Sequence, residues 1–179
     1  MALKSTIFKA DCQIADIDRS YYQPHNLTIA LHPSETEERM MVRLLAFVMN
    51  AHEHLQFTKG LSADDEPDIW QKSLTDDIEL WIDVGMPDEK RLRKASSRAD
   101  KVILCTYGGR NTVWWKQIET KLERFSNLTV VNLPKASTDQ LTLLVKRAMQ
   151  LQISLQDGQI WVSDDQQTVH IVPEIWLNY

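Results

Sequence analysis

Two aspartates, Asp68 and Asp83, stand where a pair of β-strands would bring carboxylates together. Residues 68–73 and 78–85 are typical of two strands joined by a short turn. With the turn centred between residues 75 and 76, Asp68 lies directly opposite Asp83. Opposed Cβ atoms on paired strands are about 4.5–5.5 Å apart, and like charges so placed repel each other. We therefore expect a cation beside the two carboxylates, and a divalent metal ion would serve.

The return strand has two chemically different faces, which set its orientation. Alternate residues of a strand point to opposite sides, so apolar residues at every second position predict one buried face. This face carries Ile78, Leu80, Ile82 and Val84. The other face carries Glu79, Trp81 and Asp83.

A third carboxylate, Glu38, lies in a segment whose apolar spacing predicts a long helix ending near Leu55. Ser34 and Glu37 have the S-x-x-E spacing of a capping box, which places the start of the helix. Glu38 is close in angle to Leu45 on the apolar stripe, and a carboxylate at the margin of a buried face needs a partner. The alternatives are an arginine, a backbone N–H, or a metal ion shared with Asp68 and Asp83.

Composition indicates one soluble domain, residues 1–179, with a hydrophobic fraction of 43% and a charged fraction of 25%. Cys12 and Cys105 have neither the number nor the spacing of a zinc site or a disulfide framework. The longest apolar run, Leu44 to Met49, is too short to cross a membrane, and the N-terminus has no secretory signal. We expect a reduced, cytoplasmic protein without a membrane partner.

The net charge of −5 counts against a dedicated nucleic-acid binder, which normally has a basic surface. A local basic stripe next to the hairpin could still contact phosphates. The alternative is that its residues are solvated positions of a helix. The stripe consists of Lys90, Arg91, Arg93, Lys94, Arg98 and Lys101.

The remaining pattern predicts an α/β fold: a single domain with a mixed β-sheet flanked by helices. Alternation at 8–14 and 27–31 predicts an antiparallel strand pair, with 21–25 as the connection. After Pro87 a helix, a buried strand, a second helix and another buried strand are typical of parallel strands with crossover helices. These three later elements span residues 102–105, 113–125 and 128–133, and a helix at 141–148 and strands at 151–155, 160–162 and 169–172 follow.

The chain resembles the YaeQ family of bacterial proteins over nearly its whole length. The resemblance rests on HPSETEERM (residues 32–40), FTKGLSADDEPDIW (57–70), ELWIDVGMPDEKRLRKA (79–95) and LQDGQIWVSDD (155–165). It implies a core like that of the PD-(D/E)xK, or restriction-endonuclease-like, nucleases, with a variant of their site. The additional N- and C-terminal strands would flank this core.

The resemblance also implies roles for individual residues. Asp68, preceded by Pro67, would be the aspartate of the PD element, Asp83 the second acidic residue, and Glu38 the first-helix carboxylate. These three would hold Mg²⁺ or Mn²⁺ for phosphodiester hydrolysis. The nuclease pattern has lysine two residues after the second acid, where this chain has Gly85.

A cation from the next helix would then be needed, and Lys94 is the first candidate, with Arg91 as its substitute. Two other interpretations remain open. The chain could be a binding or regulatory module that kept the fold without the chemistry and contacts a protein partner. Alternatively, Asp68 and Asp83 could be structural residues paired with Arg91 or Arg93.

Overall fold

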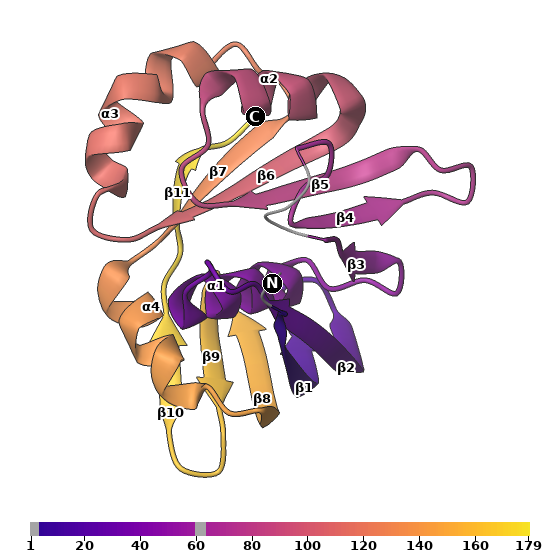
Figure 1. The fold of residues 1–179 in the computed structure, drawn as a ribbon, viewed down its shortest axis with the longest axis vertical. Helices are drawn as coiled ribbons and strands as arrows, with labels where there is room; N and C mark the ends of the chain where they lie inside the picture. Colours follow the sequence, from indigo (N-terminus) through magenta and orange to yellow (C-terminus); the bar gives the residue numbers. More distant parts are fainter. Residues whose placement is uncertain (1–3, 60–63) are drawn as a thin grey trace. The chain divides into compact units, whose positions relative to one another are not determined.

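The computed structural model describes residues 4–59 and 64–179 and shows an α/β protein (Figure 1). The chain forms two compact units. The first comprises Met1–Met41 and Pro134–Pro173, and the second comprises Val42–Leu133 and Glu174–Tyr179. Each unit contains one β-sheet, so the predicted class is confirmed, but the strands divide between two sheets where the sequence led us to expect one.

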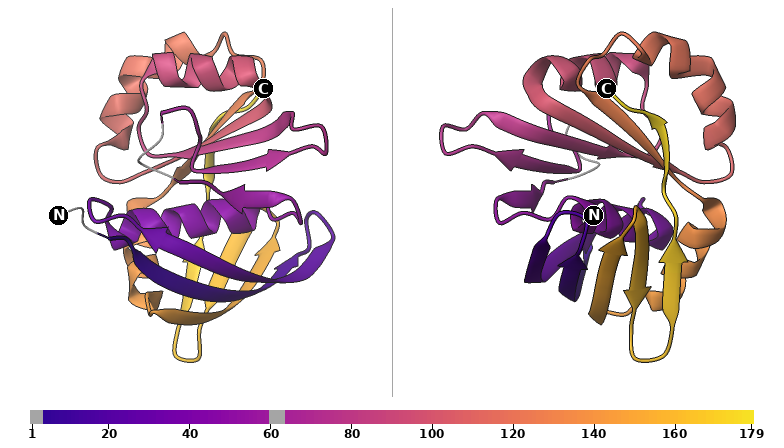
Figure 2. Two further views of the ribbon diagram at one scale, coloured as in Figure 1. Left: turned by 45° about the vertical axis from the view of Figure 1, so that its right-hand side comes forward. Right: turned by 180° about the vertical axis from the view of Figure 1, so that it is seen from behind.

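The first unit contains a five-stranded sheet in the order β10-β9-β8-β1-β2. Strand β1 is antiparallel to β2 and parallel to β8, and Figure 2 shows β1 and β2 as long, curved neighbours. The predicted N- and C-terminal strands are thus confirmed, and they pair with each other. Their bounds are Thr6–Asp16 (β1), Tyr21–Leu31 (β2), Ala148–Gln156 (β8), Gln159–Ser163 (β9) and Thr168–Ile171 (β10).

Strand β2 begins earlier than the sequence indicated. Residues 21–25 are strand, so the prediction of a connection there was wrong. Pro24 pairs with Gln13 of β1, and β2 is the last strand of the sheet. Proline, which cannot donate a backbone hydrogen bond, is tolerated at such an edge.

The helical part of the first unit lies nearer the N-terminus than predicted. Helix α4 spans Lys135–Leu141 and a 3₁₀ turn follows at Thr142–Leu144, whereas we expected a helix that begins after Ser137 and continues through the apolar positions at 141–148. The chain is extended again at Val145, which leads into β8. One of the apolar positions that suggested a helix, Ala148, is in fact the first residue of β8.

Helix α1, Glu37–Met49, contributes residues to both units. The Oγ1 atom of Thr36 accepts a hydrogen bond from the Arg39 N–H at 3.1 Å, so Thr36 rather than Ser34 caps the helix. The predicted end near Leu55 was also wrong, because Leu55 begins β3. At 13 residues α1 is the longest helix in the described ranges, where no helix has the length and apolar character needed to span a membrane.

The second unit contains a six-stranded mixed sheet in the order β11-β7-β6-β5-β4-β3. Strands β5, β6 and β7 are parallel and are joined by crossover helices α2 (Glu89–Arg98) and α3 (Asn111–Leu122), and the β6–α3–β7 part confirms the predicted parallel unit. The final strand, β11 (Glu174–Leu177), was not anticipated. The other bounds are Leu55–Phe57 (β3), Ile69–Lys72 (β4), Ile78–Val84 (β5), Ala99–Tyr107 (β6) and Leu128–Leu133 (β7).

Helices α2 and α3 cover the same face of this sheet (Figure 1). Trp81 of β5 is fully buried here against Leu92 and Ala95 of α2. Asp83 is two residues further along β5 and shares the face of Trp81, so the strand directs its carboxylate toward α2. The packing of α2 on the sheet thereby determines which side chains Asp83 meets.

Candidate functional site

The β4–β5 hairpin aligns Asp68 with Asp83. Ile69 pairs with Ile82 and Trp70 with Trp81, so the residue before β4 stands opposite Asp83. The Asp68 N–H donates to the Ile82 carbonyl at 3.1 Å, which continues the ladder by one residue. The predicted alignment of Asp68 with Asp83 is therefore confirmed, although the register shifts at an irregularity between Gln71 and Lys72, nearer the turn.

Both aspartates are buried, and the structure gives their carboxylates different partners. Asp68 is 4% exposed and Asp83 is 2% exposed. Oδ2 of Asp68 accepts a hydrogen bond from the Val84 N–H at 2.8 Å. A buried carboxylate is costly without such compensation, so this backbone donor stabilises the charge of Asp68 where it stands.

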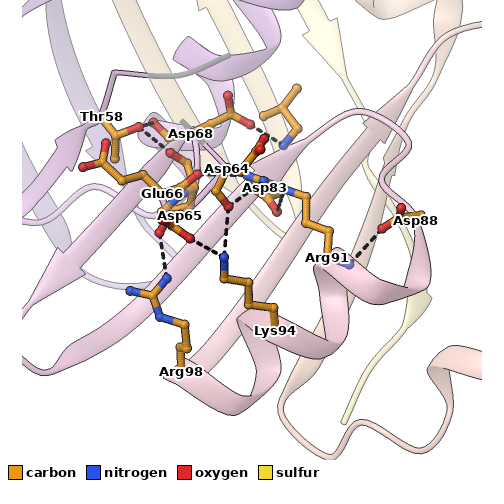
Figure 3. A network of polar contacts seen from close by, with 12 residues as sticks. Thr58, Asp64, Asp65, Glu66, Asp68, Asp83, Asp88, Arg91, Lys94 and Arg98 are labelled. Carbon is orange, nitrogen blue, oxygen red and sulfur yellow. Dashed lines mark hydrogen bonds and ion pairs between the residues drawn. The ribbon is translucent and has the colours of Figure 1, made fainter. Parts of the chain in front are cut away.

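Asp83 is held by both arms of the Arg91 guanidinium (Figure 3). Nε of Arg91 lies 2.8 Å from Oδ2, and Nη2 lies 2.9 Å from Oδ1. Asp88 caps α2 by accepting from the Arg91 N–H at 2.8 Å, which sets the start of the helix and the direction of the Arg91 side chain. Paired parallel hydrogen bonds of this kind are among the stronger polar contacts in proteins.

The same contacts stabilise the protonated, positively charged form of Arg91. The hydrogen bond to Asp83 raises the pKa of the guanidinium above its ordinary value, although burial opposes this rise. The charges of Asp83, Asp68 and Asp64 raise the pKa further. Arg91 is thus the cation that the two opposed carboxylates required, whereas Arg93 pairs with Glu89 at 2.6 Å.

Lys94, the first candidate for the missing cation, contacts the acidic segment Asp64–Glu66 that precedes the hairpin. Its Nζ forms an ion pair with Asp65 and lies 3.5 Å from the carbonyl oxygen of Asp64. The hydrogen bond from Lys94 lowers the pKa of Asp65. The acidic run 64–66 and the basic stripe are both visible in the sequence, but their contact was not predicted.

Gly85 occupies the position where the nuclease pattern has lysine. Its φ is +118°, a conformation that residues with a side chain rarely adopt, and its N–H donates to the Cys105 carbonyl at 2.9 Å. A Cβ atom here would meet no neighbour within 4 Å, so the restriction lies in the backbone and not in space. The backbone therefore favours glycine, and a basic residue for this site has to come from another element.

Glu38, the proposed third ligand, has its described neighbours in the first unit. Burial raises the pKa of its carboxyl, and the hydrogen bond with Asp139 of α4 raises it further, while the charge of Lys135 opposes the rise. The structure thus gives Glu38 a second carboxyl group as partner, where we had considered an arginine or a backbone N–H. A role beside Asp68 and Asp83 stays a prediction.

The donor set at the hairpin can be compared with what a metal ion needs. Within residues 4–59 and 64–179, no group of three or more His, Cys, Asp or Glu side chains is placed to hold one. Mg²⁺ is commonly bound by only one or two carboxylates together with waters and phosphates, so Asp68 and Asp83 fit this requirement. Since Arg91 contacts both oxygens of Asp83, a metal ion would have to replace it there.

Comparison with known proteins assigns the chain to a family. Residues 1–173 match the family described as YaeQ protein. The chain is 46% identical over 177 residues to the YaeQ proteins of Escherichia coli strain K12 and Salmonella typhi, covering 98% of each chain.

Two crystal structures have the same fold. The YaeQ protein from Xanthomonas axonopodis pv. citri superposes with a TM-score of 0.93 at 44% identity, covering 96% of this chain and 98% of that one. The YaeQ protein from Pseudomonas syringae also gives a TM-score of 0.93, at 35% identity, covering 98% of this chain and 97% of that one. The similarity therefore extends over the whole chain.

Proposed function

The chain belongs to the YaeQ family, and from the cluster of Asp68, Asp83 and Arg91 we propose that it is a divalent-cation-dependent phosphodiesterase of the nuclease-like type. The observation that carries the proposal is the alignment of two buried aspartates on neighbouring strands, with Arg91 of the following helix directly beside them. Buried carboxylates in such a pair are an unfavourable arrangement unless a cation accompanies them. The raised pKa of Arg91 adds to this support, because titratable groups with perturbed pKa values are typical of functional sites.

Asp68 and Asp83 would hold Mg²⁺ or Mn²⁺ together with a backbone carbonyl of β5 such as that of Val84. The bound cation would lower the pKa of a coordinated water and offset charge on the scissile phosphate. Arg91 is well placed for two roles in turn. It neutralises Asp83 in the free protein, and its planar fork suits the non-bridging oxygens of a phosphate once Asp83 binds a metal ion.

The backbone conformation at Gly85 disfavours the lysine of the nuclease pattern, so helix α2 would supply that positive charge instead. Lys94 lies one turn beyond Arg91 on α2, and a flexible ammonium group can follow a phosphate through the transition state. The expected gain in rate is electrostatic, because a positioned donor acts most strongly where negative charge develops on the phosphate in the transition state.

A second candidate is a binding module with the same fold and no chemistry. The specific observation in its favour is the Arg91–Asp83 pair, which is complete as a structural ion pair without any other ligand. In this interpretation the aspartates stabilise the junction between the hairpin and α2. A protein or nucleic-acid partner would then bind elsewhere on the surface.

Nucleic-acid cleavage with Mn²⁺ present separates the two candidates. We would assay plasmid DNA and single-stranded RNA with wild type, Asp83→Asn, Lys94→Ala and Arg91→Ala, using Arg93→Ala as the matched control. An enzyme should lose nearly all activity in Asp83→Asn, and one of the two cation variants should cost about a hundredfold or more. Arg93→Ala should stay close to wild type, because Arg93 contacts Glu89 and not the aspartates.

The occupancy of the site is measured separately from its activity. Titration of Mn²⁺ followed by electron paramagnetic resonance should show one bound ion in wild type and a large loss of affinity in Asp83→Asn. The phosphodiesterase proposal falls if wild type cleaves no nucleic acid above the Asp83→Asn background, and the metal site falls if wild type binds no Mn²⁺. The binding-module interpretation then takes its place.

A further inference from the structure

We infer that α2 carries a binding row for the phosphates of a nucleic-acid strand, formed by Arg91, Lys94 and Arg98, and that the acidic segment Asp64–Glu66 competes with the strand for this row. The inference rests on the proposed function, since it assigns a substrate-binding surface and a means of control to the same site. It adds the extension of that surface to Arg98 and the role of the segment.

The three cations lie on one side of α2. Their spacing of three and four residues places them on a common helical face, and the helix rise of about 1.5 Å per residue separates the first from the last by about 10 Å along the axis. The guanidinium carbons of Arg91 and Arg98 lie 6.0 Å and 5.4 Å from the centre of the buried Trp81 ring. The side chains at both ends of the row therefore lie near the same residue of β5, Trp81.

The acidic segment presents oxygen atoms to every member of the row (Figure 3). Nη2 of Arg91 donates to the Glu66 carbonyl at 2.9 Å, and Nη1 of Arg98 donates to the Asp65 carbonyl at 2.7 Å. Between them, Lys94 forms its ion pair with the Asp65 carboxylate. Phosphate oxygens are acceptors of the same kind, so a bound strand and this segment would use the same donors.

The contacts differ in how easily they can be exchanged. The side chains of Lys94 and Asp65 are 41% and 83% exposed, and ion pairs between exposed side chains are weak and screened by salt. The carboxylate of Asp83 is only 3% exposed and holds Arg91 with two hydrogen bonds. A strand would therefore displace the segment from Lys94 and Arg98 first, and Arg91 would follow only when Asp83 binds a cation.

The overall charge explains why such control is useful. A protein with a net charge of −5 repels polyanions, so binding depends on the few places where cations are concentrated. With the segment in place, the carboxylate of Asp65 cancels part of that local charge. Removal of this carboxylate should release Lys94 and raise the local positive charge without changing any donor in the row.

The test measures binding of a fluorescently labelled single-stranded oligothymidylate by anisotropy, at low salt and with EDTA, so that neither metal nor cleavage is needed. Asp65→Asn should bind about two- to fivefold more tightly than wild type, the range expected from removal of one exposed ion pair. Asp165→Asn is the matched control. It removes the same charge from an equally exposed aspartate, which pairs with Lys146 in the other unit.

Variants of the row provide the second arm. In the Asp65→Asn background, Lys94→Ala and Arg98→Ala should each weaken binding and reduce the slope of log affinity against log salt by about one. Arg93→Ala, whose side chain contacts Glu89, should leave the slope unchanged. All variants should retain the unfolding midpoint of wild type, because the residues changed are exposed or half-exposed.

Three outcomes would overturn the inference. The first is equal tightening by Asp65→Asn and Asp165→Asn, which would be an effect of net charge alone. The second is an unchanged salt slope in both row variants. The third is binding of poly-glutamate in preference to the oligonucleotide, which would identify an acidic protein partner.

The inference and the proposed function fail in different ways. Cleavage that persists while Asp65→Asn leaves binding unaltered removes the inference and keeps the phosphodiesterase. Binding that follows the expected order without any cleavage in Mn²⁺ supports the phosphate row and removes the phosphodiesterase.

Discussion

Replacing Arg91 by alanine should destabilise the protein far more than replacing its neighbour Arg93. Asp83 is buried, and Arg91 contributes the hydrogen bonds to both of its carboxylate oxygens. Removal of one partner from a buried ion pair typically costs 3–5 kcal/mol, because a charge is left in a poorly solvated place. The Arg91 side chain is 30% exposed, so water can enter after its removal, and we expect about 3 kcal/mol.

The matched control contains the same change of residue. The side chains of Arg93 and Glu89 are 58% and 23% exposed, and the loss of such a surface pair costs about 0–1 kcal/mol. Urea unfolding followed by circular dichroism gives both free energies, provided that the slope against urea concentration is unchanged. If Arg91→Ala and Arg93→Ala unfold at the same urea concentration, the pair does not stabilise the fold and the burial argument is wrong.

A second step connects this stability to the metal site. Adding Asp83→Asn to Arg91→Ala removes the buried charge that Arg91→Ala leaves without its partner. The double variant should therefore recover part of the lost free energy of unfolding. Mg²⁺ or Mn²⁺ should do the same for the single variant Arg91→Ala if Asp68 and Asp83 bind the ion. Saturation at a hundred times the dissociation constant contributes about 2.7 kcal/mol. A failure of both ions to raise the midpoint of Arg91→Ala would refute the metal-binding role of the pair.

Two further substitutions test other residues of the argument. Glu38→Gln should raise the free energy of unfolding around pH 7 and have little effect around pH 4. Folding raises the pKa of Glu38, so the protein loses stability as the pH rises and this carboxyl becomes charged in the folded state. Glutamine carries no such charge. Urea unfolding at both pH values measures this, and a variant that is more stabilising at the lower pH would contradict the sign. Gly85→Ala and Gly85→Lys should each cost about 1–2 kcal/mol, since φ is +118° there. Thermal unfolding measures that cost, and a Gly85→Lys variant as stable as wild type would show that the backbone does not explain the missing lysine.

The amino-acid sequence by itself determined the local geometry around Asp68 and Asp83. The pattern of the two strands predicted the alignment of the two aspartates, because side chains in paired strands repeat every two residues. It did not reveal the shift in register between Gln71 and Lys72, which lies nearer the turn. The helix predicted after Pro87 likewise begins there, and the structure shows Asp88 as its N-cap. Local spacing was less reliable at the ends of α1, where two candidate caps lie two residues apart.

Tertiary structure alone decided which cation meets which carboxylate. The sequence left Arg91, Arg93 and Lys94 as candidates, and only the structure shows that Arg91 reaches Asp83 and Lys94 reaches Asp65. That choice depends on how α2 packs over Trp81 on the sheet. The division of the strands into two sheets and the contact between Glu38 and Asp139 have the same origin, since they join segments distant in the chain. Local periodicity describes the faces of each element, whereas pairing between elements depends on distances that only the folded chain establishes.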